Sequence, residues 1–294
     1  MFCNCFYRNY KFLCDDNILV LLPKIDIGNK SLLFMTSVIN KDKAKFGYEK
    51  QYRQKSFAEH KIKLPITASS EIDFEFMESF VAELEAERVA ELEAYLAAAS
   101  LKDYELTADE LSALSKFENY NWGEFRIGDL FDSSNGNFDI QKSHINDKGY
   151  FVVTAGETNN GILGKSDIEA RIFEANTITI DMFGFVFFRQ FEYKMVTHAR
   201  VFSLKPKFKT THKQGLFLAS LFKHLKTKFG YDNMCSWAKI KDDKIQLPIN
   251  KDGDIDFEFM NNFIKAIEKL VIKDVVLYTD NKIKATKSIV SSNQ

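Results

Sequence analysis

Cysteine and histidine are the residue types of this chain whose spacing could indicate metal chemistry. Cys3, Cys5 and Cys14 lie close together in the sequence, as thiolate ligands of zinc often do. An internal repeat, described below, aligns them with positions that suit buried or half-buried strands: Val186, Phe188 and Thr197. A free cysteine behaves there as a small hydrophobic residue, so we interpret these thiols and Cys235 as structural, without a metal or a disulfide.

No catalytic constellation is found in the sequence. The five histidines are scattered and lack metal-ligand spacing: His60, His144, His198, His212 and His224. No Gly-rich loop stands between a strand and a helix, as nucleotide cofactors require. The Asn/Asp-Pro-Pro-aromatic motif of adenine methyltransferases is absent, since none of the 4 prolines are adjacent. We therefore expect a non-enzymatic chain without a cofactor.

The net charge of -1 hides three blocks of opposite sign. Residues 186–250 hold 13 basic and 4 acidic side chains, and residues 1–66 hold 12 and 6. Residues 71–118, between these blocks, hold 3 basic and 14 acidic side chains. Either basic block alone could simply solvate a globular domain, but two basic blocks at matching places of a repeat favour a polyanionic partner.

Length and composition suit two globular domains of ordinary size in 294 residues. Hydrophobic residues make up 45% of the chain and 28 residues are Phe, which is enough for aromatic-rich cores. No apolar run approaches the roughly 18 residues that cross a bilayer. The first eight residues also lack the basic start and long apolar run of a signal peptide. These features predict a cytoplasmic protein without a membrane partner.

One block of the sequence is written twice, at an offset of 183 residues without a gap. Residues 62–66 return as 245–249, and the text IDFEFM begins at both Ile72 and Ile255. Further pairs match upstream: residues 43–48 with 226–231, 33–34 with 216–217, and 10–11 with 193–194. Residues from about 119 to 183 have no counterpart in the first copy. A period this long indicates two whole domains in tandem.

The acidic block predicts a long amphipathic helix over residues 73–99, because apolar side chains recur there at three- and four-residue steps. Thr107 and Glu110 predict a capping box for a shorter helix. The second copy repeats the long helix from Asp256. Each long helix must bury one stripe, and we expect the two to pair antiparallel, or to meet helices of another subunit. The expected contacts set Phe74, Met77, Val81 and Leu84 against Phe259, Phe263, Ile267 and Leu270.

Residues 119–250 predict a mixed α/β domain. Short β-branched and aromatic runs bounded by turn residues predict strands near 125–131, 150–155, 177–181, 185–189 and 201–204. Residues 216–228 predict a helix with Leu218, Leu221, Phe222 and Leu225 on its buried side. The expected fold class is therefore α/β, with mixed α+β domains and long amphipathic helices that form an antiparallel coiled-coil-like spacer.

Three segments, in this order, resemble the target recognition domain in specificity subunits of Type I and related Type II restriction-modification systems. They are residues 121–131 (NWGEFRIGDLF), 154–161 (TAGETNNG) and 176–184 (NTITIDMFG). The closing IQLPI followed by a long helix is also typical of this family. The resemblance covers residues 119–280 fully, and residues 1–100 as half a domain plus a helix.

The resemblance implies that each recognition domain reads half of a split DNA site in the major groove, while the helices set the spacing and carry methyltransferase subunits. The implied partners are double-stranded DNA and the modification subunits, with the restriction subunit left open. Four parts are implied: residues 1–70, the carboxy-terminal half of a first recognition domain; 71–118, a helical spacer; 119–250, a complete second domain; and 251–294, a distal helix and tail.

The first recognition domain departs from the family pattern, because it lacks a counterpart of residues 119–183. That counterpart could lie on another chain, and we expect text related to it upstream of Met1 or in a neighbouring reading frame. This departure leaves an alternative function open. The chain could be a relic or a helical assembly module that binds partner subunits without reading a DNA sequence.

The candidate DNA contacts are polar side chains within residues 133–200. Asparagine amides can pair with adenine, arginine can reach guanine or phosphate, and lysine can bind phosphate. The candidates are Lys142, Asn159, Asn160, Lys165, Arg171, Arg189, Lys194 and Arg200. For Asn160 the alternative is the turn that an Asn-Gly pair favours. Lys228 and Tyr231 recur in both copies, so we interpret them as structural or phosphate-binding.

Overall fold

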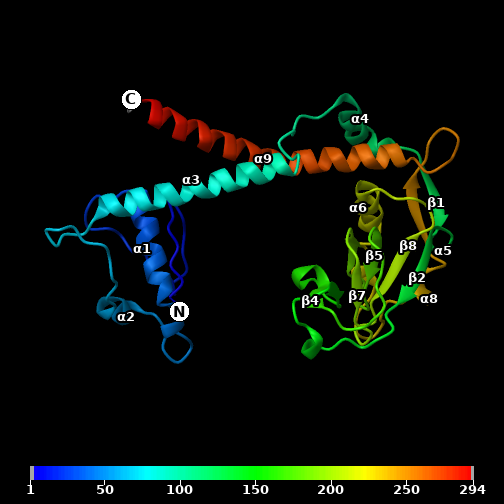
Figure 1. Cartoon of the computed structure of the whole chain (residues 1–294), viewed down its shortest axis with the longest axis horizontal. Helices are drawn as coiled ribbons and strands as arrows, with labels where there is room; N and C mark the ends of the chain where they lie inside the picture. Colours follow the sequence, from blue (N-terminus) through cyan, green and yellow to red (C-terminus); the bar gives the residue numbers. More distant parts are fainter. Residues whose placement is uncertain (1–2, 293–294) are drawn as a thin grey trace. The chain divides into compact units, whose positions relative to one another are not determined.

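The chain forms two compact units in the computed structural model, which describes residues 3–292 and side chains up to residue 285 (Figure 1). Unit 1 comprises residues 1–102 and 274–294, and unit 2 comprises residues 103–273. Helix α9 (Phe257–Ser292) begins in unit 2 and ends in unit 1. Over the described residues, no helix combines the length and apolarity needed to cross a bilayer.

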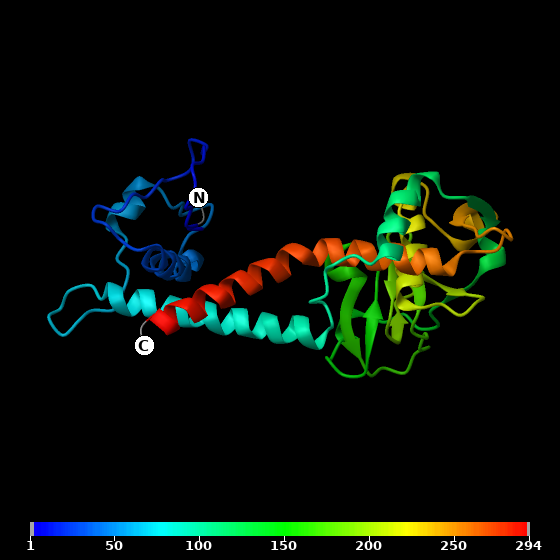
Figure 2. The same ribbon diagram turned by 90° about the horizontal axis from the view of Figure 1, so that it is seen from above.

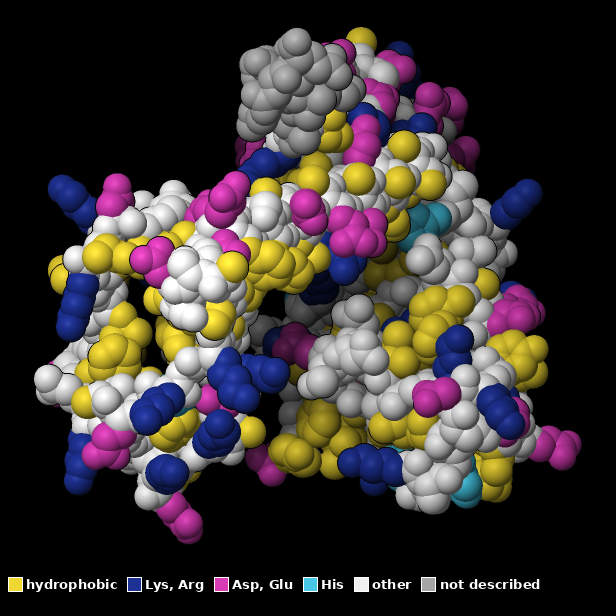
Figure 3. All heavy atoms as spheres, turned by 60° about the vertical axis from the view of Figure 1, so that its left-hand side comes forward, with side chains coloured by type: hydrophobic (Ala, Val, Ile, Leu, Met, Phe, Trp, Pro, Cys, Tyr) yellow, Lys and Arg dark blue, Asp and Glu magenta, His cyan; other side chains and the backbone are white. Residues whose placement is uncertain are grey.

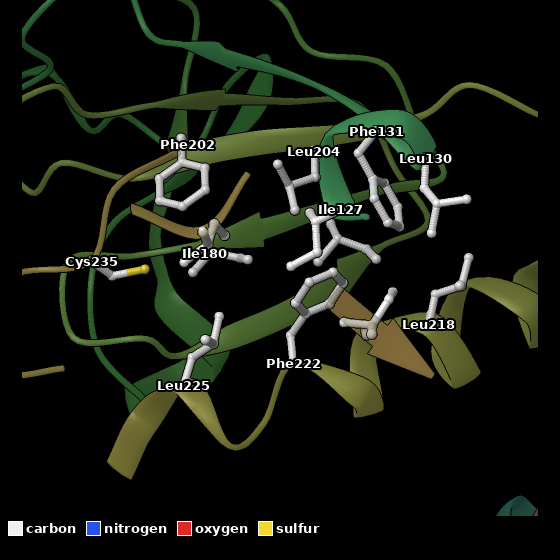
Figure 4. Close-up of a cluster of buried hydrophobic side chains, with 14 of the residues drawn as sticks. Ile127, Leu130, Phe131, Ile180, Phe202, Leu204, Leu218, Phe222, Leu225 and Cys235 are labelled. Carbon is white, nitrogen blue, oxygen red and sulfur yellow. The ribbon is translucent and has the colours of Figure 1, made fainter. Parts of the chain in front are cut away.

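Unit 2 is a mixed α/β domain, as predicted. Its main sheet has four antiparallel strands in the order β2-β8-β5-β6, with bounds Phe131–Asn135, Phe202–Pro206, Thr177–Ile180 and Val186–Arg189. Helix α6 (His212–Leu221) packs on this sheet, and Figure 4 shows Leu218 and Phe222 pointing at the strand residues Ile180 and Leu204. The capping box at Thr211 and Gln214 fixes the start of α6.

A second, smaller sheet in unit 2 has the order β4-β3-β7, with bounds Ile162–Ser166, Tyr150–Val153 and Tyr193–Met195. It has its own core, which includes Val152, Val153 and Met195. The buried Tyr193 hydroxyl links the two sheets, because it lies 2.9 Å from Thr177 Oγ1 and 2.7 Å from Ser203 Oγ. Burial raises the pKa of Tyr193, so the hydroxyl stays protonated and can donate in this pair of bonds.

Strands β1 (Trp122–Arg126) and β9 (Lys244–Pro248) form a two-stranded antiparallel sheet beside the main core. The start of α9 packs here: Tyr120 stacks on Phe259 at 3.8 Å between ring centroids, and Phe117 stacks on Phe263 at 4.4 Å. The predicted pairing of Phe259 and Phe263 with the other long helix was therefore wrong. These rings cover the core of their own domain instead.

Short helices complete unit 2. They are α4 (Ala108–Lys116), with the predicted capping box at Thr107 and Glu110, α5 (Ile127–Leu130), α7 (Leu225–Lys228), α8 (Trp237–Ile240), and the 3-10 turns η2 (Phe117–Asn119), η3 (Lys142–His144) and η4 (Thr158–Gly161). The helix predicted over 216–228 is broken between α6 and α7, but Leu218, Phe222 and Leu225 are buried as expected.

Unit 1 is helical among its described residues. It contains α1 (Asn29–Lys41), η1 (Lys43–Lys45), α2 (Gln54–Glu59), α3 (Phe74–Ala98) and the last part of α9. Phe34 of α1 packs edge-on against Phe76 and Phe80 of α3, at 6.4 and 5.8 Å between centroids. Figure 2 shows the ribbons of α3 and the last part of α9 from above. Ion pairs join α3 and its following loop to α9: Glu85 with Lys282 at 3.9 Å, and Lys102 with Asp280 at 3.6 Å. The two long helices predicted from the sequence are thus present.

The two copies of the repeat share backbone and side-chain bonds at the same offset. The bridge between Ile66 and Ile72 returns between Ile249 and Ile255. Asp73 caps α3 through Phe76 N at 2.8 Å, and Asp256 accepts from Phe259 N at the same distance. Further pairs match: Ser31 with Phe74 O and Gln214 with Phe257 O, and Lys30 with Glu85 and Lys213 with Glu268. The sequence repeat is therefore a structural repeat.

The cysteines lie in different environments. Cys3 and Cys235 are buried, and burial raises the pKa of both thiols, to about 12 for Cys235. Cys5 is half-buried, with its backbone held by Asn40 at 2.7 and 2.9 Å. Cys14, however, is exposed, so the prediction of a structural thiol was wrong there. Its matching residue Thr197 is half-buried beside a sheet that unit 1 does not form among its described residues.

Candidate nucleic-acid interface

The η4 turn between β3 and β4 presents two neighbouring asparagines of the predicted set. Asn159 and Asn160 have φ of 49° and 52°, and Gly161 follows at 67°. The turn is closed by a bond from Thr154 N to Gly161 O at 2.8 Å. The Asn159 amide also donates to Ile162 O at 3.1 Å. The Asn-Gly turn proposed for Asn160 is therefore real, and both asparagine side chains remain exposed on it.

A buried carboxylate holds this turn in place. Asp181 accepts a bond from Gly156 N at 2.7 Å, and bonds from Phe183 N and Phe185 N at 2.9 and 3.0 Å. Burial raises the pKa of Asp181 despite these donors. The loop before Asn159 and the turn after β5 are thereby tied to one side chain. Exposed amides on such a fixed turn are pre-organised for hydrogen bonding to a ligand.

Arg189, a predicted base or phosphate contact, lies inside unit 2 and is only 2% exposed. Its Nε donates to Thr179 Oγ1 at 2.9 Å, and its guanidinium stacks on Phe187 at 4.9 Å. Burial lowers the pKa of Arg189 to about 10. The described residues offer its Nη2 no hydrogen-bond partner. In this conformation Arg189 supports the domain from within, and it is not presented at the surface where DNA could contact it.

Lys194 is also enclosed within unit 2. It is 3% exposed, and its ammonium donates to Ser166 O at 3.3 Å and to Ile168 O. A cation with these backbone partners joins β7 to the segment after β4. It cannot reach a phosphate from there, because the charge lies under the surface. The sequence could not reveal this, since lysine is rarely buried and its position in a short strand was not predicted.

Three predicted cations are accessible around the smaller sheet. Lys165, on β4, is half-buried. Its ammonium lies 4.7 Å from the centre of the Phe151 ring, and this contact orients the side chain. Arg171 is exposed, with its guanidinium 5.0 Å from the Phe173 ring and 3.4 Å from Asn135 O. Lys142 is exposed in η3, whose last residue is bonded to Ser166 at the end of β4. The structure therefore gathers Lys142 and Lys165 beside one strand end.

Arg200 is exposed before β8 with φ of 49°, and its Nη1 lies 3.2 Å from Met234 Sδ. The structure adds Lys226, which sequence reasoning missed. Its ammonium pairs with Glu157 of the η4 loop at 2.5 Å and lies 4.8 Å from the Phe185 ring. The sequence feature that could have identified Lys226 is the repeat, in which Lys43 is its counterpart. Lys228 pairs with Asp243 at 2.8 Å and Tyr231 packs on Phe183 at 4.9 Å, which agrees with a structural role.

Within the part of the chain that the structure describes, no group of His, Cys, Asp and Glu side chains could hold a metal ion. The exposed candidates are amides and cations instead. Such a set binds anionic and hydrogen-bonding surfaces, as the edges and backbone of a nucleic acid offer.

Comparison with known proteins places the chain in a family. The family model described as Type I restriction modification DNA specificity domain matches residues 1–94 and 119–278. The Type II restriction enzyme BgcI specificity subunit S.BcgI of Heyndrickxia coagulans is 24% identical over 270 residues, which are 91% of this chain and 75% of that protein.

The fold is similar to a solved structure, the Type I restriction-modification system S subunit from M. genitalium. The TM-score is 0.51 at 14% identity, over 89% of this chain and 71% of that chain. The family match covers both copies of the repeat and far more than half of the chain. The chain belongs to the family of Type I restriction modification DNA specificity domains, and it is a non-catalytic specificity subunit of a restriction-modification system.

Proposed function

We propose that this chain directs a methyltransferase, and the nuclease of the same system, to one DNA sequence, and that unit 2 reads part of that sequence. The observation that carries this proposal is the η4 turn, which exposes Asn159 and Asn160 and is closed by the bond from Thr154 N to Gly161 O, while the buried Asp181 holds Gly156 in the loop before it. An asparagine amide can pair with adenine in the major groove, which distinguishes one base from another only if the amide is held in place.

Basic side chains around the turn supply the second requirement, which is affinity for the DNA backbone. Lys142, Lys165, Arg171 and Arg200 are at least partly accessible, and among the described residues no carboxylate forms an ion pair with them. Each phosphate contact releases a counterion, so binding should weaken steeply with salt. We assign phosphate contact to these cations and base contact to the asparagines.

The long helices are the proposed surface for the methyltransferase subunits. Apolar side chains stay open on both of them: Tyr95 on α3, and Leu270, Val271 and Tyr278 on α9. Exposed apolar residues on helices of a folded domain commonly mark protein interfaces. Residues 71–118 and 251–294 then serve as spacer and distal helix of a cytoplasmic complex, beside the recognition domains at 1–70 and 119–250.

DNA binding can be tested on duplexes selected by the full chain from a randomised pool. Lys142→Ala and Lys165→Ala should each weaken binding to every sequence and reduce the slope of log affinity against log salt by about 0.9. Asn160→Ala should instead relax the preference at one base pair by about 1–3 kcal/mol and leave the salt slope unchanged.

A matched control is Lys251→Ala, which removes an exposed lysine from the turn before α9. It should change neither the slope nor the preference. If the pool yields no preferred sequence, or if Lys251→Ala lowers the slope as much as Lys142→Ala, the assigned reading surface is wrong.

A further inference from the structure

One short turn recurs in both copies of the repeat. The sequence Phe-Gly-Tyr stands at residues 46–48 and again at residues 229–231, and we call these segments the FGY turns. A backbone bond closes each turn, because the amide of its glycine donates to the carbonyl oxygen three residues later at 3.1 Å in both copies. The two copies therefore share the hydrogen bond of this turn as well as its sequence.

The tyrosine of each FGY turn lies at the surface, since Tyr48 is 81% exposed and Tyr231 is 78% exposed. Other matched residues differ between the units: Tyr10 is 59% exposed in unit 1, whereas its counterpart Tyr193 is 0% exposed in unit 2. The difference in burial between the units therefore does not explain the exposure of the FGY tyrosines. Core packing does not require a tyrosine that is exposed in both copies, and its hydroxyl can reach a ligand.

The glycine of each FGY turn is not required by the conformation or the packing of the turn. Neither Gly47 nor Gly230 lies in the left-handed region of φ, unlike Gly149 and Gly161, which both have φ of 67°. A Cβ atom at either position would meet none of the described residues within 4 Å, apart from the adjoining ones. A glycine of this kind commonly allows a ligand to approach the backbone closely.

Basic side chains surround both FGY turns. Residues 223–241 hold 5 basic and 1 acidic side chains, and the matching residues 40–58 hold 6 and 2. Figure 3 shows Lys and Arg side chains of unit 1 gathered below α3, in the region of α1 and α2. Lysine is depleted in protein–protein interfaces, so this surplus of positive charge favours a polyanion as the ligand.

In unit 2 the FGY turn is connected to the η4 turn. The Tyr231 ring packs on Phe183 at 4.9 Å between centroids, and Phe183 N donates to Asp181. The same carboxylate accepts from Gly156 N, in the loop before η4. A duplex that the η4 turn contacts can therefore reach Tyr231 with its sugar–phosphate backbone.

We propose that each FGY turn binds the sugar–phosphate backbone of DNA. The tyrosine hydroxyl donates to a phosphate oxygen, and the glycine leaves room for the strand. A backbone contact is the same for every base sequence, so one turn serves both copies, whereas residues that read different bases should differ between copies. The inference rests on the proposed function only in that the chain binds DNA, and it is independent of base reading by the η4 turn.

The test measures binding of the full chain to the selected duplex and to a duplex with the same bases in shuffled order, both with long flanks, over a range of salt. Tyr231→Ala and Tyr48→Ala should each weaken binding to both duplexes about tenfold, because a hydrogen bond to a charged phosphate is lost. The salt slope should stay unchanged, since a neutral side chain releases no counterion.

Two further variants separate contact from folding. Tyr231→Phe keeps the ring on Phe183 and should weaken binding as Tyr231→Ala does, because both remove the hydroxyl. Gly230→Val removes no polar group and should weaken binding to both duplexes by filling the space that the strand needs. The matched control Leu111→Ala shortens an exposed side chain of α4 and should leave binding unchanged. The urea midpoint should be equal for all these variants.

The proposal is overturned if either Tyr48→Ala or Tyr231→Ala binds both duplexes as tightly as the unchanged chain does. It is also overturned if these variants weaken binding to the selected duplex alone, because the tyrosines would then read bases. Normal DNA binding with lost assembly of the methyltransferase subunits would make the turns a protein interface instead. If Asn160→Ala leaves the base preference unchanged while the tyrosine variants weaken binding, base reading by η4 fails and this proposal stands.

Discussion

Leu204→Ala should destabilise unit 2 by about 2–5 kcal/mol, the usual cost of a cavity left by a buried leucine. Leu204 is fully buried on β8 and packs in the core between the main sheet and α6. Leu21→Ala, at the matching position of unit 1, should cost less than Leu204→Ala, because Leu21 is already 39% exposed and buries less area. The same substitution thus has effects of different size at matching positions of the two copies.

Tryptophan fluorescence measures the first effect cleanly. The chain has 2 tryptophans, Trp122 and Trp237, and both pack against the core of unit 2. The urea midpoint seen by fluorescence should therefore fall for Leu204→Ala. Far-UV circular dichroism, which also follows α1 and α3, should show little change for Leu21→Ala. Equal losses in the two variants would mean that Leu21 is as buried in solution as Leu204.

Gly215→Leu should also destabilise unit 2, by about 1–3 kcal/mol, through overpacking between α6 and β6. A Cβ atom at Gly215 would lie 2.1 Å from the Phe188 ring, which is closer than real contacts allow. The first copy carries Leu32 at the position of Gly215, and Cys5 at that of Phe188. The large and small residues have exchanged places between the copies.

The double variant tests this reading of the pair. Gly215→Leu with Phe188→Cys reproduces the combination of the first copy, so it should recover at least part of the stability lost in the single variant. A thermodynamic cycle over the two sites gives the coupling energy, which for residues in contact is commonly about 0.5–3 kcal/mol. If the double variant loses as much stability as the two single variants lose together, the two positions do not compensate each other.

The repeat was the part of the sequence that predicted the most. A repeat with an offset of 183 residues indicates two domains in tandem. The bridge between Ile66 and Ile72 recurs between Ile249 and Ile255, where the offset places it. The long helices followed from periodicity, and the capping box at Thr107 was confirmed. Strands β2, β4, β7 and β9 were not predicted as such, because a strand of three to five residues depends on a neighbour far away in the sequence.

The burial of charged side chains near the candidate site could not be predicted from the sequence. Arg189 and Lys194 looked like surface cations because composition gives no sign of an enclosed guanidinium or ammonium. The sequence predicted the apolar side of α9, but the periodicity of apolar residues does not identify which residues cover that side. Phe259 and Phe263 are covered by Tyr120 and Phe117, which lie in the same unit, just after α4. Asn159 and Asn160 have no counterpart in the first copy, so the repeat gave no information on how they are held.

Methylation of plasmid DNA by the cognate methyltransferase subunits, with and without this chain, tests the central claim most directly. Sites are mapped by sequencing the modified bases. We expect methylation at one recurring sequence only when the chain is present, and a broader set of sites when Asn160→Ala replaces it. Identical sequence-specific methylation with and without the chain would contradict the specificity role, and would favour an assembly module that binds partner subunits without reading DNA.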